Sequence, residues 1–312
     1  MQPKLIIHGG AGPSLAGKGG LAPVRQALHA IVQQVYPILL KGGTAEEAVI
    51  QGCQLLEDNP RFNAGTGSVL QSDGQVRMSA SLMNGTLQQF SGVINVSRVK
   101  NPILLAQWLQ TCSDRVLSDY GAAELAREMG LPVHNPLTDL RVKEWVQDRH
   151  HAETIAMARV LAEDPGEDQA GRGTIGVVAL DSQGHLAAGT STGGKGFERI
   201  GRVSDSAMPA GNYANPQAGV SCTGIGEDII NECLAARIVV RVTDGQSLQE
   251  AFRTSFSEAQ QNHRDFGAIG LDATGAIAWG KTCGVLVAAY HDGDQIGDVL
   301  EWDGLVDGLP AI

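Results

Sequence analysis

The sequence predicts an α+β protein in which two stacked antiparallel sheets carry helices on their outer faces, a four-layer αββα sandwich. Segments with the periodicity of strands and helices follow the order strand, helices, strands, helices, strands, helices, strands. Short turn sequences, Asn84-Gly85 and 181–184, join consecutive strand segments. Such turns favour hairpins, and therefore antiparallel pairing over a doubly wound parallel sheet.

In the first half of the chain, the spacing of apolar residues and the stop signals define each element. An apolar run predicts a strand over 5–8. Apolar residues at helical spacing predict helices over 22–40 and 44–56, and the second helix opens with the capping-box sequence Thr44-Ala45-Glu46-Glu47. The remaining elements are strands over 76–83 and 92–99 and helices over 102–112, 122–129 and 137–161.

In the second half, a polar and acidic segment over about 163–173 cannot bury an apolar face, so we expect an exposed linker there. β-branched residues directly after it predict a buried strand over 174–180, and a hairpin turn leads to its partner. The remaining elements are strands over 186–192, 267–271, 277–279 and 285–290 and helices over 226–242 and 247–262. No internal repeat is recognisable, so a single domain is expected over 1–312.

The composition narrows the class of partner. The formal net charge of −11 argues against nucleic acid or an anionic membrane surface as the main partner. The five cysteines lack the paired spacing of a zinc site, and free thiols in a reducing compartment are expected. Neither a signal-peptide pattern nor an apolar run of membrane-spanning length occurs, which predicts a cytoplasmic protein.

Thr174 stands where the linker meets the strand, and this position permits a particular chemistry. A threonine hydroxyl is a weak nucleophile unless a base lies beside it, and its own α-amino group can be that base once the chain is cut before it. Gly173 would tolerate a distorted backbone at the cut bond. On this pattern alone, a threonine that merely begins a strand is the simpler interpretation.

Five motifs support the catalytic interpretation by their number and order. They are HGGAG at 8–12, FNAGTG at 62–67, TSTGG at 190–194, GRVSDS at 201–206 and SCTGIGE at 221–227. With Gly173-Thr174, they resemble the plant-type asparaginase / isoaspartyl peptidase family of N-terminal-nucleophile hydrolases. The resemblance spans nearly the whole chain, and it also implies the αββα sandwich.

The resemblance implies a self-processing enzyme that needs no cofactor for its chemistry. The precursor would cut itself between Gly173 and Thr174, giving an α fragment of residues 1–173 and a β fragment of residues 174–312. Thr174 would then attack the side-chain amide of L-asparagine or the isopeptide bond of β-aspartyl dipeptides and release aspartate. The family's assembly implies a dimer of αβ units, a heterotetramer.

The resemblance also assigns roles to individual residues. Thr223 and Gly224 match the oxyanion hole, and Thr192 matches a threonine that contacts the nucleophile. Arg202 matches the residue that holds the substrate α-carboxylate, and Asp205 the residue that takes the α-ammonium. Asn63 lies in a loop expected to pack near Thr174. Without the resemblance, Arg202 and Asp205 would be read as an exposed local ion pair and Thr223 as a turn residue.

The loop over 56–66 resembles a segment that holds a monovalent cation, sodium or potassium, through backbone carbonyls. The carbonyls concerned are those of Leu56, Glu57, Asn59, Phe62, Ala64 and Thr66. A plain turn after a helix fits the same residues equally well.

Two alternative functions remain open from the sequence. The first is an enzyme of the same fold that hydrolyses glycosylated asparagine, although enzymes with that activity are usually secreted or lysosomal. The second is a nucleotide-binding protein that uses the P-loop-like spacing from Gly12 to Lys18, but Gly19 stands where a P-loop needs Ser or Thr. His8, at the end of a buried strand, is expected to make structural hydrogen bonds rather than to act as a base.

Overall fold

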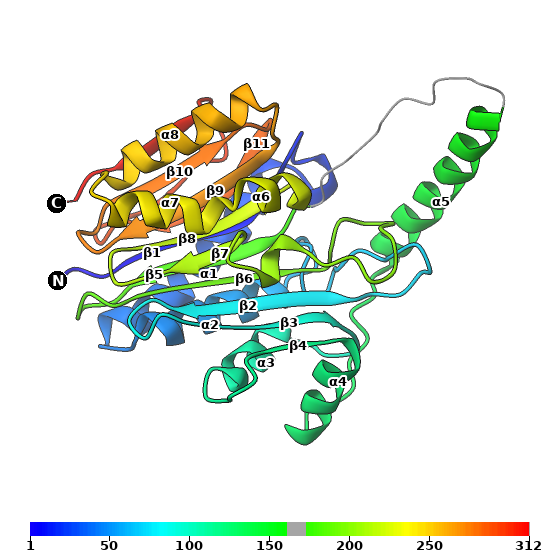
Figure 1. Ribbon diagram of the computed structural model, residues 1–312, viewed down its shortest axis with the longest axis horizontal. Helices are drawn as coiled ribbons and strands as arrows, with labels where there is room; N and C mark the ends of the chain where they lie inside the picture. Colours follow the sequence, from blue (N-terminus) through cyan, green and yellow to red (C-terminus); the bar gives the residue numbers. More distant parts are fainter. Residues whose placement is uncertain (161–172, 312) are drawn as a thin grey trace.

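A computed structural model of the chain describes residues 1–160 and 173–311. Within these ranges, two stacked sheets lie between two layers of helices, which confirms the predicted α+β sandwich (Figure 1). One layer of helices covers each outer face, and helix α5 extends away from the rest of the molecule.

Eight of the described strands form one sheet, here called the large sheet, in the order β12-β11-β1-β5-β6-β2-β3-β4. Its neighbours pair antiparallel except β3 and β4, which are parallel. The strands are β1 (Lys4–Gly12), β2 (Met78–Asn84), β3 (Gln89–Val96), β4 (Val116–Ser118), β5 (Ile175–Leu180), β6 (Leu186–Thr192), β11 (Val285–His291) and β12 (Ile296–Asp298).

The other five described strands form the small sheet, in the order β13-β10-β9-β8-β7, and all its pairs are antiparallel. They are β7 (Asn212–Ala214), β8 (Ala218–Gly224), β9 (Phe266–Asp272), β10 (Ile277–Lys281) and β13 (Val306–Leu309).

The helices separate by sheet. Helices α1, α2 and α3 pack on the large sheet, and α7 and α8 on the small sheet. The described α-helices are α1 (Leu21–Leu40), α2 (Ala45–Glu57), α3 (Pro102–Leu109), α4 (Asp119–Glu128), α5 (Asp139–Val160), α6 (Gly226–Glu232), α7 (Leu234–Thr243) and α8 (Leu248–Gln261), and the short 3₁₀ turns are η1 (Ala16–Lys18) and η2 (Asp205–Ala207). In the part of the chain that the structure describes, no helix has the length and apolarity that a membrane span requires.

The alternation of side chains along β5 shows why the layers stack in this way. Val177 and Ala179 face the helices α1 and α2, whereas Val178 and Leu180 face the small sheet. All four residues are fully buried, and each large apolar side chain removed from water contributes roughly 1.5–3 kcal/mol. Because both of its faces are covered, β5 is held at the centre of the molecule. The residues just before β5 are therefore held in place as well.

Several expected elements are confirmed and others need correction. The capping box at Thr44 forms, with its hydroxyl accepting from the Glu47 amide. The helix expected over 226–242 is instead two helices, because Cys233 adopts a left-handed backbone with φ 47°. The strands β4, β7, β8, β12 and β13 were not expected; four of them are too short to show a period, and β8 is rich in small residues.

The linker expected over 163–173 lies outside the described residues except for Gly173, which is buried rather than exposed.

Candidate active site

Thr174 lies one residue before β5, and only 6% of its surface is exposed. Three strands meet around it. Strand β6 pairs with β5 and ends at Thr192, β1 pairs with β5 on the other side, and β8 of the small sheet brings Thr223 beneath it. The order of the strands therefore gathers residues that are far apart in the sequence.

The polar groups of Thr174 are held by two other threonines. Its backbone N–H donates to Thr223 Oγ1 over 3.1 Å, and its hydroxyl donates to Thr192 Oγ1 over 3.2 Å. Thr192 Oγ1 also accepts from the Gly194 amide at 3.1 Å. The Thr174 hydroxyl thus has a fixed direction next to its own backbone nitrogen.

Gly173 adopts a backbone conformation that favours glycine, with φ 74°. Its carbonyl oxygen accepts from Asn63 Nδ2 at 2.9 Å. A Cβ on Gly10 would lie 2.9 Å from Gly173 Cα, so the two backbones touch. Asn63 is fixed in turn, since its side-chain oxygen accepts from the Val69 amide at 3.0 Å. The peptide bond before Thr174 therefore follows a left-handed glycine backbone, and its carbonyl accepts from a fixed donor.

Thr223 is buried behind Thr174, and its hydroxyl oxygen accepts from two amides, those of Thr174 and Ala11, each at 3.1 Å. A hydroxyl has two acceptor positions and one proton. Because both acceptor positions are used, the proton of Thr223 remains to be donated. Gly224, the next residue, lines the cavity beside Thr174.

Arg202 and Asp205 lie on one side of this cavity, in and before η2. The Arg202 guanidinium donates twice to Glu227, at 2.7 and 3.1 Å, which orients it. Glu227 was not recognised from the sequence, although it closes the SCTGIGE motif. A Cβ on Gly226 would lie 2.6 Å from both Arg202 Nη2 and Asp205 Oδ1, so glycine is what lets both charges approach this backbone.

Asp205 is 3% exposed, and its Oδ1 accepts from the Ser204 hydroxyl at 3.1 Å. Its Oδ2 is buried and has no hydrogen-bond partner among the described residues. Burial raises the pKa of Asp205 to about 6, although the positive charge of Arg202 opposes the rise. Asp205 lines the cavity, and a buried carboxylate there is suited to bind a cationic group of a ligand.

His8 supports the nucleophile from behind. Its Nδ1 lies 3.0 Å from the Thr174 carbonyl oxygen, and its Nε2 lies 2.9 Å from Ser221 Oγ, which in turn contacts Thr190 Oγ1 at 2.7 Å. Burial lowers the pKa of His8 to about 3, although the hydrogen bond to Thr174 opposes the change. A neutral imidazole bonded on both nitrogens positions the chain. Ser221 and Thr190 could not be identified as its partners from the sequence.

A cavity of about 690 Å³ brings most of the expected site residues to one surface: Gly173, Thr174, Thr192, Arg202, Asp205 and Gly224. Asn63 and Thr223 do not line it in the uncut chain, where they bond to Gly173 and Thr174. Lys18 lines the same cavity from the turn η1, and α1 begins only at Leu21. The residues 12–18 therefore do not form the strand–loop–helix of a phosphate-binding loop.

The loop after α2 carries the carbonyls expected to hold a cation. Glu57 O accepts from the Thr66 amide at 2.8 Å, and Asn59 O from the Phe62 amide at 3.1 Å. A Cβ on Gly67 would lie 2.6 Å from Pro60 O and 2.9 Å from Phe62 O, so several carbonyls crowd a glycine backbone. Leu56 O, in the last turn of α2, accepts from the Asn59 amide at 3.3 Å, and Ala64 and Thr66 lie in the loop that follows. The loop thus supplies neutral carbonyl oxygens, the type of donor that hard cations prefer.

Within residues 1–160 and 173–311, no group of three or more His, Cys, Asp or Glu side chains could hold a metal ion.

The αββα layers and a buried threonine placed just before a central strand are the features of the N-terminal-nucleophile hydrolases. The chain belongs to the asparaginase family, because the Asparaginase family model matches residues 1–301. This confirms the family indicated by the five motifs.

The names of similar proteins agree with this family. The chain is 70% identical to an isoaspartyl peptidase/L-asparaginase of Nostoc sp. over 96% of this chain and 95% of the relative. It is 67% identical to a protein of the same name from Synechocystis sp., over 99% and 92%. A plant-type L-asparaginase of Pyrococcus horikoshii is 37% identical, over 92% of this chain and 95% of the relative.

Proposed function

We propose that the chain is an isoaspartyl peptidase and L-asparaginase that matures by cutting itself between Gly173 and Thr174. The observation that carries this proposal is the setting of Thr174, whose buried hydroxyl and backbone nitrogen are held side by side by Thr192 and Thr223. The names of relatives at 70% and 67% identity support the substrate class.

The self-cleavage step takes place at the junction of Gly173 and Thr174. The Thr174 hydroxyl oxygen attacks the Gly173 carbonyl carbon, and the Asn63 amide donates to the carbonyl oxygen as it gains negative charge. The bond from the Gly173 carbonyl carbon to the Thr174 nitrogen breaks, and that nitrogen takes the hydroxyl proton. Water then hydrolyses the ester, which leaves a carboxylate on Gly173 and a free amine on Thr174.

In turnover, the free amine of Thr174 is the base. It takes the proton of its own hydroxyl, and the oxygen attacks the side-chain carbonyl of the substrate. Thr223 Oγ1, with its proton still to donate, and the Gly224 N–H stabilise the resulting oxyanion. The leaving nitrogen takes the proton from Thr174, so that ammonia or an amino acid departs. Water, activated by the same amine, releases aspartate from the ester.

Arg202 and Asp205 select the aspartyl part of the substrate. The guanidinium, oriented by Glu227, keeps N–H groups for the α-carboxylate, and a planar fork suits that group. The carboxylate of Asp205, which lines the cavity, accepts from the α-ammonium. Both groups exist on asparagine and on a β-aspartyl dipeptide, so one half of the cavity serves both substrates.

Three further features belong to the proposal. The carbonyl loop after α2 would hold a structural sodium or potassium ion; in that case, replacing sodium and potassium by a large organic cation should lower the thermal midpoint. Two αβ units would form the active assembly, which light scattering can test. The five free cysteines fit a reducing compartment such as the cytoplasm.

The experiment that tests the activity offers three substrates to the fully cut protein: L-asparagine, β-aspartyl-leucine and glycosylated asparagine. We expect aspartate to be released from the first two. Hydrolysis of glycosylated asparagine alone would favour the alternative activity, and fully cut protein that acts on none of the three would refute the proposal.

A further inference from the structure

The cavity at Thr174 is larger than asparagine requires. Its volume of about 690 Å³ lies within the range of sites that hold drug-sized ligands, and asparagine is much smaller. The aspartyl part of a substrate is accounted for by Arg202, Asp205 and Gly224 on one side. The part of the lining formed by Phe197 and by helix α5 has no role in the steps above.

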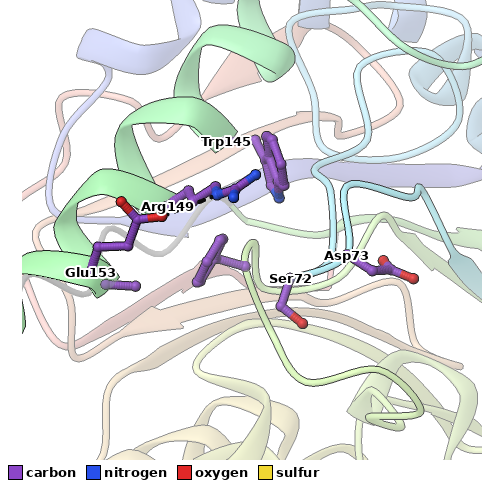
Figure 2. Close-up of a pocket in the computed structure, with 7 residues that line it drawn as sticks. Ser72, Asp73, Trp145, Arg149 and Glu153 are labelled. Atoms are coloured by element: carbon purple, nitrogen blue, oxygen red, sulfur yellow. Dashed lines mark hydrogen bonds and ion pairs between the residues drawn. The ribbon is translucent and has the colours of Figure 1, made fainter. Parts of the chain in front are cut away.

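A second cavity of about 520 Å³ begins where this side ends. It is lined by Ser72, Asp73, Trp145, Arg149, Ala152, Glu153 and Phe197, and we call it the aromatic cavity. Ala152 and Phe197 line both cavities, so the two are neighbours that share a wall. Figure 2 shows Trp145, Arg149 and Glu153 along α5, across from the loop of Ser72 and Asp73.

The aromatic cavity is preformed. The Trp145 indole N–H donates to the Gln71 carbonyl at 2.9 Å, which fixes the plane of the ring. Backbone hydrogen bonds from Phe197 to Leu70 at 2.8 Å and from Ser72 to Glu198 at 3.0 Å join the two loops beneath it. A ligand would therefore enter without ordering these loops, which favours binding.

The aromatic cavity presents two aromatic rings, and the charged side chains at its rim form ion pairs with one another. The rings of Trp145 and Phe197 lie 6.4 Å apart and are tilted by 47°, and both residues are partly exposed. The charges around them are paired locally, Asp73 with Arg77 at 2.9 Å and Arg149 with Glu153 at 3.3 Å. The Arg149 guanidinium also lies over the Trp145 ring, 5.7 Å from its centroid. The Phe197 ring and this stacked pair of Trp145 and Arg149 are the features that can recognise a ligand, and they suit an aromatic or large apolar group.

We propose that the aromatic cavity binds the side chain of the leaving residue when the chain cleaves a β-aspartyl dipeptide, and that it favours aromatic and large apolar side chains. The inference rests on the proposed function. It follows from position, because the leaving residue extends from the scissile bond away from Arg202 and Asp205. Asparagine has no such side chain, since its leaving group is ammonia.

The test compares kcat/KM of the fully cut protein for β-aspartyl-phenylalanine, β-aspartyl-glycine and L-asparagine. Without any variant, phenylalanine as leaving residue should be preferred over glycine about tenfold, as expected for one buried aromatic contact. Trp145→Ala should remove about this factor from the phenylalanine-to-glycine ratio. Trp145→Phe keeps a ring and should retain most of the preference.

The matched control is Val146→Ala, which alters the next residue of α5, a 41% exposed side chain that lines neither cavity, and should leave the ratio unchanged. Equal hydrolysis of the two dipeptides by the unaltered protein would overturn the inference. So would a Trp145→Ala protein that loses activity on all three substrates by one factor, since Trp145 would then only support the fold. If the unaltered protein releases aspartate from none of the three, the proposed function itself fails.

Discussion

The junction around Thr174 and the aromatic cavity lie on neighbouring surfaces but are built in opposite ways. At the junction, Asn63, Thr192 and Thr223 are buried, and each makes a hydrogen bond to Gly173 or Thr174. In the aromatic cavity, the rings are partly exposed and the charges pair with one another at the rim. Changes at the junction should therefore affect every reaction, and changes in the aromatic cavity only the substrates that reach it.

The largest effect should come from Thr174→Ala, which removes both the nucleophile and the hydroxyl that cuts the chain. We expect a single uncut chain on a denaturing gel and a loss of at least about 10⁴-fold in aspartate release from every substrate. Thr174→Ser, which keeps a hydroxyl, should still cut itself. A Thr174→Ala protein that appears as two fragments would show that the Thr174 hydroxyl does not cut the chain. The contrast between the junction and the aromatic cavity would then have no basis.

Asn63→Asp should slow the self-cleavage by about 100-fold, the usual effect of losing one oxyanion donor. Aspartate is of similar size and keeps an oxygen for the Val69 amide, but it cannot donate to the Gly173 carbonyl. The rate can be followed by gel densitometry of freshly purified protein, with circular dichroism to check the fold. An unchanged rate would show that the bond from Asn63 only holds the loop.

Arg202→Lys should lower kcat/KM by about 10–100-fold for asparagine and β-aspartyl dipeptides alike, because a single ammonium cannot replace the planar fork. Self-cleavage should proceed normally, since the Arg202 side chain donates to Glu227 and not to Gly173 or Thr174. Steady-state kinetics on both substrates checks this. A loss of kcat/KM confined to the dipeptide would show that Arg202 contacts the leaving residue and not the aspartyl part of the substrate.

The smallest effect is a dependence of KM on pH. Burial raises the pKa of Asp205 to about 6, so the carboxylate is protonated as the pH falls through 6 and loses its attraction for the substrate ammonium. KM for asparagine should rise by up to about tenfold for each pH unit below 6. In Asp205→Asn, KM should be high and flat from pH 5 to 7; a KM that still rises in that variant would assign the titration to another group.

The sequence was most informative where a local pattern decides the structure. The hairpin of β5 and β6 follows from its turn sequence and β-branched residues, and the capping box at Thr44 from four neighbouring residues. Thr174 could be predicted because its neighbours form motifs of known order. The geometry around it depends on pairing between distant strands, as in the bond of His8 to Ser221, and no short pattern encodes such a bond.

The same reason explains what was missed on the cavity surface. Trp145 carries no signal in a helical stretch, and its closeness to Phe197 arises only from packing of α5 against the loop before η2. The pairing of Arg202 with Glu227 likewise joins two motifs that the sequence separates. Motif order predicted the residues that we propose to react, whereas their partners became visible only in the tertiary structure.

The intact mass of purified protein, fresh and after ageing, tests the central claim most directly. The account predicts two fragments that meet at residue 174, one ending in Gly173 and the other beginning with Thr174 and its free amine. A protein that releases aspartate while its chain remains unbroken at this position would contradict the account, because Thr174 would then have no base.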